Sequence, residues 1–98
     1  WLVTPDEVGD PQNLDLSVDV NGERMQSGNS RLMIFTVAQI VAYLSDLMTL
    51  EPGDVIATGT PPGVGMGHTP PRYLSAGDEM VLRISGLGEQ RSPVAQDP

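Results

Sequence analysis

Strict alternation of apolar and polar residues runs from Leu14 to Val20. Leucine and valine occupy the even positions, and Asp15, Ser17 and Asp19 occupy the odd positions. Such alternation predicts a half-buried strand, with its leucine and valine face covered and its acidic face solvated.

A hairpin turn is expected directly after this strand. Asn21-Gly22 is the dipeptide that most favours a two-residue turn between antiparallel strands. We therefore expect residues 23–27 to return as a short second strand that ends at residues 28–30. The amide and hydroxyl groups of residues 26–30 are interpreted as those of a turn at the hairpin end.

One amphipathic helix is predicted at about 37–48. Thr36 with Gln39 has the form of a capping box. The apolar residues that follow at helical spacing are Val37, Ile40, Val41, Leu44, Leu47 and Met48. The apolar run before the helix, residues 32–35, leaves helix and strand both open.

A turn followed by a strand is expected twice after the helix. Gly53-Asp54 precedes residues 55–58, and Gly77-Asp78 precedes residues 79–84. In each case glycine permits a positive φ and aspartate stabilises the turn. The intervening residues 59–71 are expected to form a long loop without regular structure, a length typical of functional loops.

The chain ends are expected to be irregular. Residues 1–13 predict an initial loop with one helical turn, since Thr4 and Glu7 form a capping box and Gly9 stops the turn. The tail from Ser92 onward is expected to fray. The resulting order, β-β-α-β-β, belongs to the α+β class and excludes a doubly wound sheet.

Composition narrows the possible partners. The 98 residues include 13 acidic and 5 basic side chains, for a net charge of −8. This charge repels phosphate backbones and anionic lipid surfaces, so we expect neither nucleic acid nor a membrane as partner.

Cysteine is absent, which excludes disulfides and thiolate metal sites and fits a reducing, cytoplasmic compartment. A start at Trp1, with 11 Gly and 9 Pro, indicates a piece of a larger protein.

The best candidate site is Thr58-Gly59-Thr60, where two hydroxyls flank a glycine at the end of a predicted strand. Hydroxyl and exposed backbone N–H groups there can donate to an anion such as a carboxylate. The alternative is a turn in which the threonine hydroxyls bond local backbone.

The other candidate sites are weaker. His68, the single histidine, is expected to be solvated. The glycine-rich residues 63–67 lack the context of a nucleotide-binding loop. The dispersed acidic residues indicate no metal site.

Several motifs follow one another along the chain. They are Asp10-Pro11-Gln12-Asn13-Leu14, Val20-Asn21-Gly22-Glu23, Gln26-x-Gly28-Asn29-Ser30, Met33-Ile34-Phe35, Tyr43-Leu44-Ser45, Leu50-Glu51-Pro52-Gly53-Asp54-Val55-Ile56, Thr58-Gly59-Thr60-Pro61-Pro62-Gly63-Val64-Gly65 and Gly86-Leu87-Gly88. In this order they resemble the C-terminal part of the fumarylacetoacetate hydrolase family over residues 1–90. Residues 70–74 and 86–90 resemble its 2,4-diketo-3-deoxy sugar-acid hydrolase subgroup.

This resemblance implies a fold and an activity. The fold would be a β-rich mixed-sheet roll of the fumarylacetoacetase C-terminal type, with residues 1–98 as the C-terminal portion of one catalytic domain. The activity would be divalent-metal-dependent hydrolysis of C–C bonds in 2,4-diketo acids or acylpyruvates. Mg²⁺ or Mn²⁺ would act as Lewis acid, and the full-length enzyme would be a homodimer or higher oligomer.

The resemblance also assigns the site. It places Thr60, and with it Thr58 and Gly59, beside the carboxylate of a 2-oxo acid substrate. The family's three metal-ligating acids, its His-Glu pair and its lysine precede the segment that Trp1 begins, so it implies no catalytic and no metal-ligating residue here. Arg31-Leu32 stand where the family has an aspartate before Met-Ile-Phe.

Two hypotheses of different class follow. In the first, the chain is part of a family hydrolase, or of an isomerase or decarboxylase of the 2-hydroxyhepta-2,4-diene-1,7-dioate type. In the second, it is a truncated product that folds or oligomerises without chemistry. Under either hypothesis the 98 residues alone are expected to be inactive.

Overall fold

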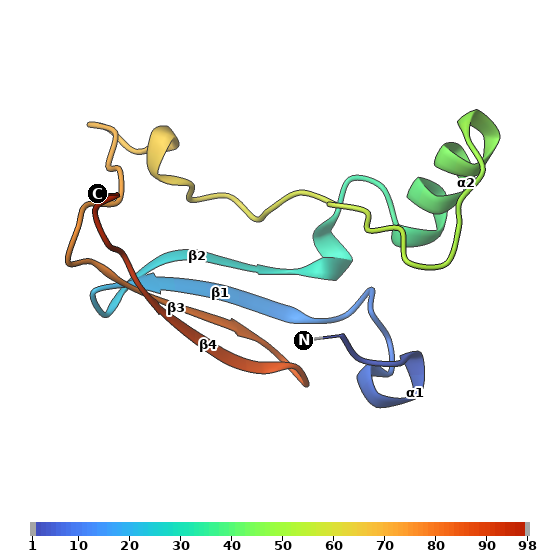
Figure 1. The fold of residues 1–98 in the computed structure, drawn as a ribbon, viewed down its shortest axis with the longest axis horizontal. Helices are drawn as coiled ribbons and strands as arrows, with labels where there is room; N and C mark the ends of the chain where they lie inside the picture. Colours follow the sequence, from blue (N-terminus) through green and yellow to red (C-terminus); the bar gives the residue numbers. More distant parts are fainter. Residues whose placement is uncertain (1, 98) are drawn as a thin grey trace.

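The computed structural model describes residues 2–97 (Figure 1). Trp1 and Pro98, the ends of the predicted initial loop and tail, lie outside the described residues. The elements in chain order are α1 (Pro5–Val8), β1 (Asp15–Val20), β2 (Glu23–Asn29), the 3-10 turn η1 (Ser30–Leu32), α2 (Val37–Leu47), the 3-10 turn η2 (Gly65–Gly67), β3 (Glu79–Ile84) and β4 (Gly88–Pro93).

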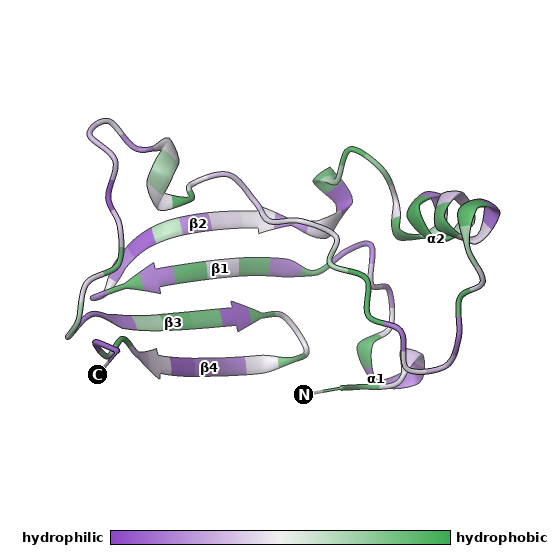
Figure 2. Ribbon diagram, turned by 45° about the horizontal axis from the view of Figure 1, so that its top comes forward, coloured by the Kyte–Doolittle hydropathy of each residue, from purple (hydrophilic) through white to green (hydrophobic). Residues whose placement is uncertain are grey.

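The strands form one sheet in the order β2-β1-β3-β4 (Figures 1 and 2). The predicted Asn21-Gly22 turn joins β1 to β2, and both of its residues have positive φ, 52° and 82°. These angles are those of a type I′ turn, whose twist matches the twist of the strands that it connects. The α+β class is confirmed, and the strand pairings found within residues 2–97 are all antiparallel.

The strand at the outer edge of the hairpin is longer than predicted. β2 continues to Asn29 because Asn29 pairs with Asp15 at the far end of β1. The register shifts between Val18 and Asp19, so β2 carries one extra residue at this bulge. Residues 26–29 are therefore strand, and the interpretation of this segment as a turn is wrong.

The second half of the sheet also differs from expectation. Residues 55–58 form no strand, and Val55 is 92% exposed. A strand needs the hydrogen-bonding groups of a neighbour, and none lies beside this segment within residues 2–97. The second strand after the helix is β4, in which Ser92 pairs with Met80. The expected fraying at Ser92 is thus wrong.

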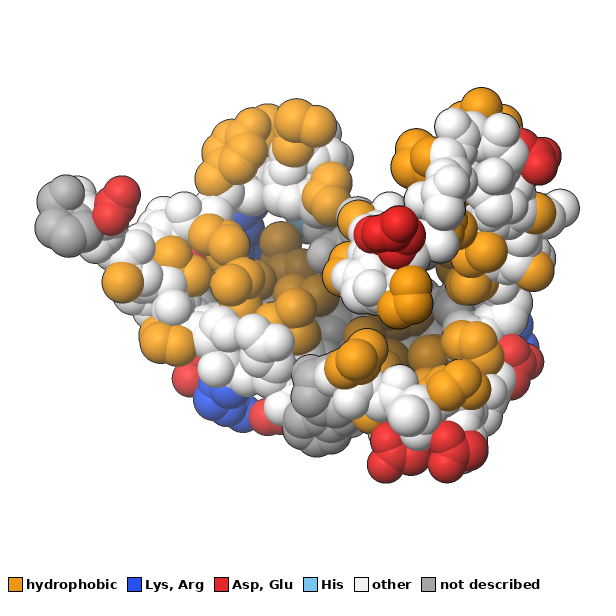
Figure 3. All heavy atoms as spheres, turned by 45° about the vertical axis from the view of Figure 1, so that its right-hand side comes forward, with side chains coloured by type: hydrophobic (Ala, Val, Ile, Leu, Met, Phe, Trp, Pro, Cys, Tyr) orange, Lys and Arg blue, Asp and Glu red, His pale blue; other side chains and the backbone are white. Residues whose placement is uncertain are grey.

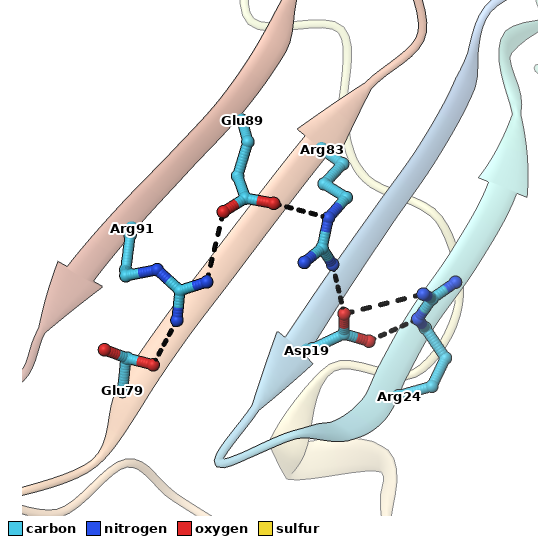
Figure 4. A network of polar contacts seen from close by, with 6 residues as sticks. All are labelled: Asp19, Arg24, Glu79, Arg83, Glu89 and Arg91. Atoms are coloured by element: carbon cyan, nitrogen blue, oxygen red, sulfur yellow. Dashed lines mark hydrogen bonds and ion pairs between the residues drawn. The ribbon is translucent and has the colours of Figure 1, made fainter.

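The polar face of the sheet is cross-linked by an ion-pair network. Its members are Asp19, Arg24, Glu79, Arg83, Glu89 and Arg91 (Figure 4). Asp19 is only 9% exposed, so the expectation of a solvated face is wrong at this position. Its carboxylate accepts hydrogen bonds from Arg24 of β2 and Arg83 of β3. The hydrogen bond from Arg24 is the largest cause that lowers the pKa of Asp19, and Arg83 lowers it further.

Helix α2 begins as predicted and stands away from the sheet. Thr36 and Gln39 form the capping box: the Gln39 N–H donates to Thr36 Oγ1 at 3.2 Å, and the Thr36 N–H donates to Gln39 Oε1 at 2.8 Å. Extensive packing between elements occurs only among the strands of the described part. The Cα radius of gyration is 15.8 Å, whereas a compact domain of this length has about 13 Å.

Residues 2–97 enclose little apolar core. Val20 and Val81, both 5% exposed, are the buried hydrophobic residues. Large apolar side chains at the surface include Leu32, Ile34, Phe35, Tyr43, Leu47, Met48, Val55, Met66 and Tyr73. On the face in Figure 3 hydrophobic side chains gather around a hollow. None of the helices among these residues has the length and apolar composition that a bilayer crossing requires.

Candidate functional site

The Thr58-Gly59-Thr60 loop lines a cavity of 530 Å³. The remaining walls come from β1, β2, the segment after β2 and helix α2. The lining residues are Leu16, Ser27, Gly28, Asn29, Ser30, Leu32, Met33, Ile34, Phe35, Ile40, Thr58, Gly59, Thr60, Pro61 and Pro62. None of these side chains is ionisable, so the residues described here can bind and orient a ligand but supply no acid or base.

Gly59 has a backbone conformation open to few other residues, and the N–H groups around it are without partners among the described residues. Its φ is +97°, a conformation that residues with a Cβ rarely adopt. The backbone N–H groups of Thr58, Gly59 and Thr60 make no hydrogen bond to other groups of residues 2–97. All three residues are exposed. Three N–H groups and two hydroxyls are therefore available to an anion or a carbonyl oxygen.

Gln26 ties this loop to β2. Its Nε2 donates to Thr60 Oγ1 at 2.8 Å and to the carbonyl oxygen of Pro61 at 2.6 Å. Gln26 is half-buried and pairs with Val18, so its backbone is held in the sheet. The sheet thus fixes the position of the Thr60 hydroxyl.

Two glycines let the loop approach β2 closely. A Cβ built on Gly28 would stand 2.9 Å from Cβ of Pro61, and one built on Gly63 would stand 2.0 Å from the carbonyl oxygen of Met25. Both distances are shorter than real Cβ contacts, so these positions require glycine. Glycine at residue 63 therefore serves packing between the loop and the sheet.

The outer part of the long loop is also anchored. The Arg72 guanidinium binds Glu23 Oε2 at 2.6 Å, and the Arg72 N–H donates to the carbonyl oxygen of Gly65 at 2.9 Å. His68 is half-buried, with Nε2 at 3.1 Å from the carbonyl oxygen of Gly63. The expectation of a solvated His68 is therefore wrong, because its ring contacts the loop backbone.

The apolar wall of the cavity is held by Gln12. Its Nε2 donates to the carbonyl oxygen of Ser30 at 2.6 Å, and its Oε1 accepts from the N–H of Val37 at 2.9 Å. These bonds fix both ends of residues 30–37, and the apolar residues 32–35 lie between them. The stretch left open by its pattern is therefore a cavity wall, without regular structure beyond η1.

The pattern of residues did not identify Gln12 and Gln26 as supports of the site. A signal for Gln26 exists, because it lies opposite Val18 on the apolar side of β2, where a polar side chain needs a partner. The bulge between Val18 and Asp19 hides this signal by changing the alternation along β2. Gln12 lies in a loop and has no comparable pattern.

A divalent metal is not accommodated by this part of the chain. No group of three or more His, Asp or Glu side chains within residues 2–97 could hold a metal ion. The residues present therefore do not fit the metal that the family resemblance implies.

Comparison with known proteins finds relatives that match nearly the whole of this chain. The family model described as fumarylacetoacetate (FAA) hydrolase C-terminal matches residues 1–95. The chain is 60% identical over 97 residues to 2,4-didehydro-3-deoxy-L-rhamnonate hydrolase of Sphingomonas sp., covering 98% of this chain and 34% of that protein. The structure of the present chain superposes on fumarylacetoacetate hydrolase of Exiguobacterium antarcticum with a TM-score of 0.91 and 46% identity. The match covers 97% of this chain and 34% of the other.

A further relative carries ligands. Maleylpyruvate hydrolase of Sphingobium sp. SYK-6, described in complex with manganese(II) and pyruvate, has a TM-score of 0.88 and 38% identity, over 100% of this chain and 34% of its own. The chain thus spans about a third of the length of the relatives that it matches.

Proposed function

The chain belongs to the fumarylacetoacetate hydrolase family, and from that premise we propose that its Thr58-Gly59-Thr60 loop binds the carboxylate of a 2-oxo acid. The observation that carries this proposal is a cluster of unpaired donors on the rim of a cavity with an apolar wall. A carboxylate matches the unpaired donors, and the short carbon chain attached to it matches the apolar wall. The protein chain is accordingly part of a hydrolase that cleaves 2,4-diketo acids or acylpyruvates.

The reaction adds one water across the bond between the methylene and the distal carbonyl carbon. The methylene carbon gains a proton and leaves as the methyl group of pyruvate, and the distal carbonyl becomes a carboxylate. In this reaction the Thr60 hydroxyl and the N–H groups of the loop hold the carboxylate of the 2-oxo acid. Residues 32–35 offer an apolar surface to the carbon chain. These residues orient the substrate, and the acid and base belong to other segments.

We also propose that residues 1–98 are the C-terminal portion of one catalytic domain that works as a homodimer or higher oligomer in the cytoplasm. A divalent metal is supported by the manganese(II) in the Sphingobium relative, and Mg²⁺ is the other candidate. Because residues 2–97 do not fit a metal, no step here is assigned to it.

An exchange of segments tests the proposal. The 97 residues of the Sphingomonas hydrolase that match this chain are replaced by the chain itself, and the chimera is assayed with 2,4-didehydro-3-deoxy-L-rhamnonate. The parent chimera is expected to cleave this substrate and release pyruvate. Thr60→Val removes the hydroxyl, and kcat/KM should fall about 10- to 150-fold, the range for a hydrogen bond to a charged group.

Thr60→Ser is the matched control, since it keeps the hydroxyl and should retain most of the activity. A folded chimera without turnover would contradict the proposed function. A chimera that isomerises its substrate without releasing pyruvate would favour the isomerase alternative.

A further inference from the structure

We propose that Gln26 is a positioning residue that sets the Thr60 hydroxyl as a hydrogen-bond donor toward the cavity. This inference rests on the proposed function, because it concerns how the same loop recognises a carboxylate.

The orientation of the Gln26 amide follows from its partners. A carbonyl oxygen only accepts hydrogen bonds, and the oxygen of Pro61 lies 2.6 Å from Nε2. The flipped amide would bring two acceptor oxygens together, so the amino group must face Pro61. Its second hydrogen then points to Thr60 Oγ1, 2.8 Å away. Both amide hydrogens are used, and the Thr60 oxygen accepts one of them.

The hydrogen bond from Gln26 leaves the hydrogen of the Thr60 hydroxyl free for a ligand. A hydroxyl that accepts from Gln26 keeps its own hydrogen for another partner, and no group within residues 2–97 accepts that hydrogen. The free hydroxyl hydrogen therefore favours an acceptor in the ligand, such as a carboxylate or keto oxygen. An ammonium group has only donors and would leave this hydrogen without a partner. Because no ionisable side chain lines the cavity, this preference for an acceptor needs no charged residue.

The support for Thr60 is stiffer than the loop that carries it. Gln26 lies in β2 and pairs with Val18. Gly28, two residues further along β2, contacts Pro61. A side chain held by a strand limits the positions open to a loop hydroxyl. Gln26 therefore acts on the ligand through Thr60 and does not itself line the cavity.

A double-mutant cycle in the chimera tests this relationship. Gln26→Met keeps the length of the side chain without its hydrogen bonds, and it should lower kcat/KM about 2- to 12-fold. In the Thr60→Val background the same change should have a clearly smaller effect, because the hydroxyl is gone and only the bond to Pro61 is left to lose. Gln90→Met is the control: Gln90 is exposed on β4 and donates to Ser92 Oγ at 3.0 Å, so its loss should change neither background.

Exchange of donor and acceptor in the hydrogen bond between Gln26 and Thr60 gives a second readout. Gln26→Glu presents an acceptor that takes the Thr60 hydrogen, so kcat/KM should fall further than in Gln26→Met at neutral pH. Protonation of the new carboxyl restores a donor, and kcat/KM relative to the parent should rise as the pH is lowered from about 7 to about 4, through the ordinary pKa of a glutamate. A merely structural role for Gln26 predicts no such relative rise.

The outcomes separate the two proposals. If Thr60→Val leaves kcat/KM unchanged, the proposed carboxylate site is wrong, and this inference falls with it. If Thr60→Val lowers kcat/KM but Gln26→Met acts equally in both backgrounds, only the positioning role of Gln26 is overturned. Should Gln26→Met fail to fold, a flat pH profile for Gln26→Glu relative to the parent overturns that role.

Discussion

Gly28 of β2 lies directly against Pro61, with the place of a Cβ on residue 28 only 2.9 Å from Cβ of the proline. This contact brings the loop that follows Thr58-Gly59-Thr60 onto the edge strand of the sheet. Gly63 repeats the arrangement further along, over the backbone of Met25. The candidate site is thus built where a long loop is laid on a strand that can receive it.

Substitution of Gly63 should test this close approach. Gly63→Ala must lift the loop from Met25, whose carbonyl oxygen would lie 2.0 Å from the new Cβ. Gly53→Ala is a matched control, because Gly53 has a similar φ of 102° but open space around it. We expect Gly53→Ala to cost about 1–2 kcal/mol from backbone strain, and Gly63→Ala about 1–3 kcal/mol more from overpacking. Urea unfolding of both chimeras measures the difference, and equal losses would contradict the contact.

The isolated 98-residue chain should not behave as a stable monomer. Ile34 and Val55 are 91% and 92% exposed, and helix α2 lacks extensive packing within residues 2–97. Apolar surface of this extent promotes association. Sedimentation velocity should therefore show oligomers or aggregates. A clean monomer with a cooperative melt above about 60 °C would instead indicate a self-sufficient domain.

Asp19 should make the stability of the chimera depend on pH. Arg24 and Arg83 lower its pKa in the folded state, so its contribution is present above the pKa of the unfolded chain, about 3.9. The contribution is lost as the pH falls through the lower pKa of the folded state, because the unfolded chain then binds the proton first.

Asp19→Asn removes this contribution and leaves two arginines facing each other. The variant should unfold at lower urea than the parent at about pH 7, and the gap should narrow below about pH 4. Asp46→Asn, at an exposed position of α2 outside the ion-pair network, should match the parent at both pH values. A gap for Asp19→Asn that stays constant with pH would refute the linkage.

The isolated chain should bind a divalent metal only weakly. Because no three acidic or histidine side chains converge within residues 2–97, we expect the chain alone to bind Mn²⁺ no better than about millimolar. Isothermal titration of the chain with MnCl₂ measures this. A single site of micromolar affinity would show that its own residues form a metal site.

Local turn chemistry was predictable from the sequence, and strand pairing was less so. Asp54 and Asp78 close the same turn: their Oδ2 atoms accept from the N–H groups of Glu51 and Ser75 at 2.9 and 2.8 Å. Only the second turn leads into a strand, because β3 has β1 and β4 as neighbours. The segment after Asp54 has no neighbour among the described residues, and pairing is a non-local property that no short pattern contains.

The same distinction applies to the site. Thr58-Gly59-Thr60 stands out by composition, since hydroxyls beside a glycine can be recognised in the sequence alone. Gln26, which positions Thr60 from 34 residues away, depends on the bulge at Asp19 and on the path of the loop. The burial of Asp19 depends likewise on arginines from two other strands, so alternation within β1 could not predict it.

The central claim is that the Thr60 hydroxyl binds the carboxylate of a 2-oxo acid, and pyruvate tests it most directly. The inhibition constant of pyruvate is measured for the parent chimera and for Thr60→Val, together with the melting temperature of each. The account predicts inhibition weaker by about 10- to 150-fold, with little change in melting temperature. An unchanged inhibition constant with a lowered melting temperature would show that Thr60 is a turn residue and would contradict the account.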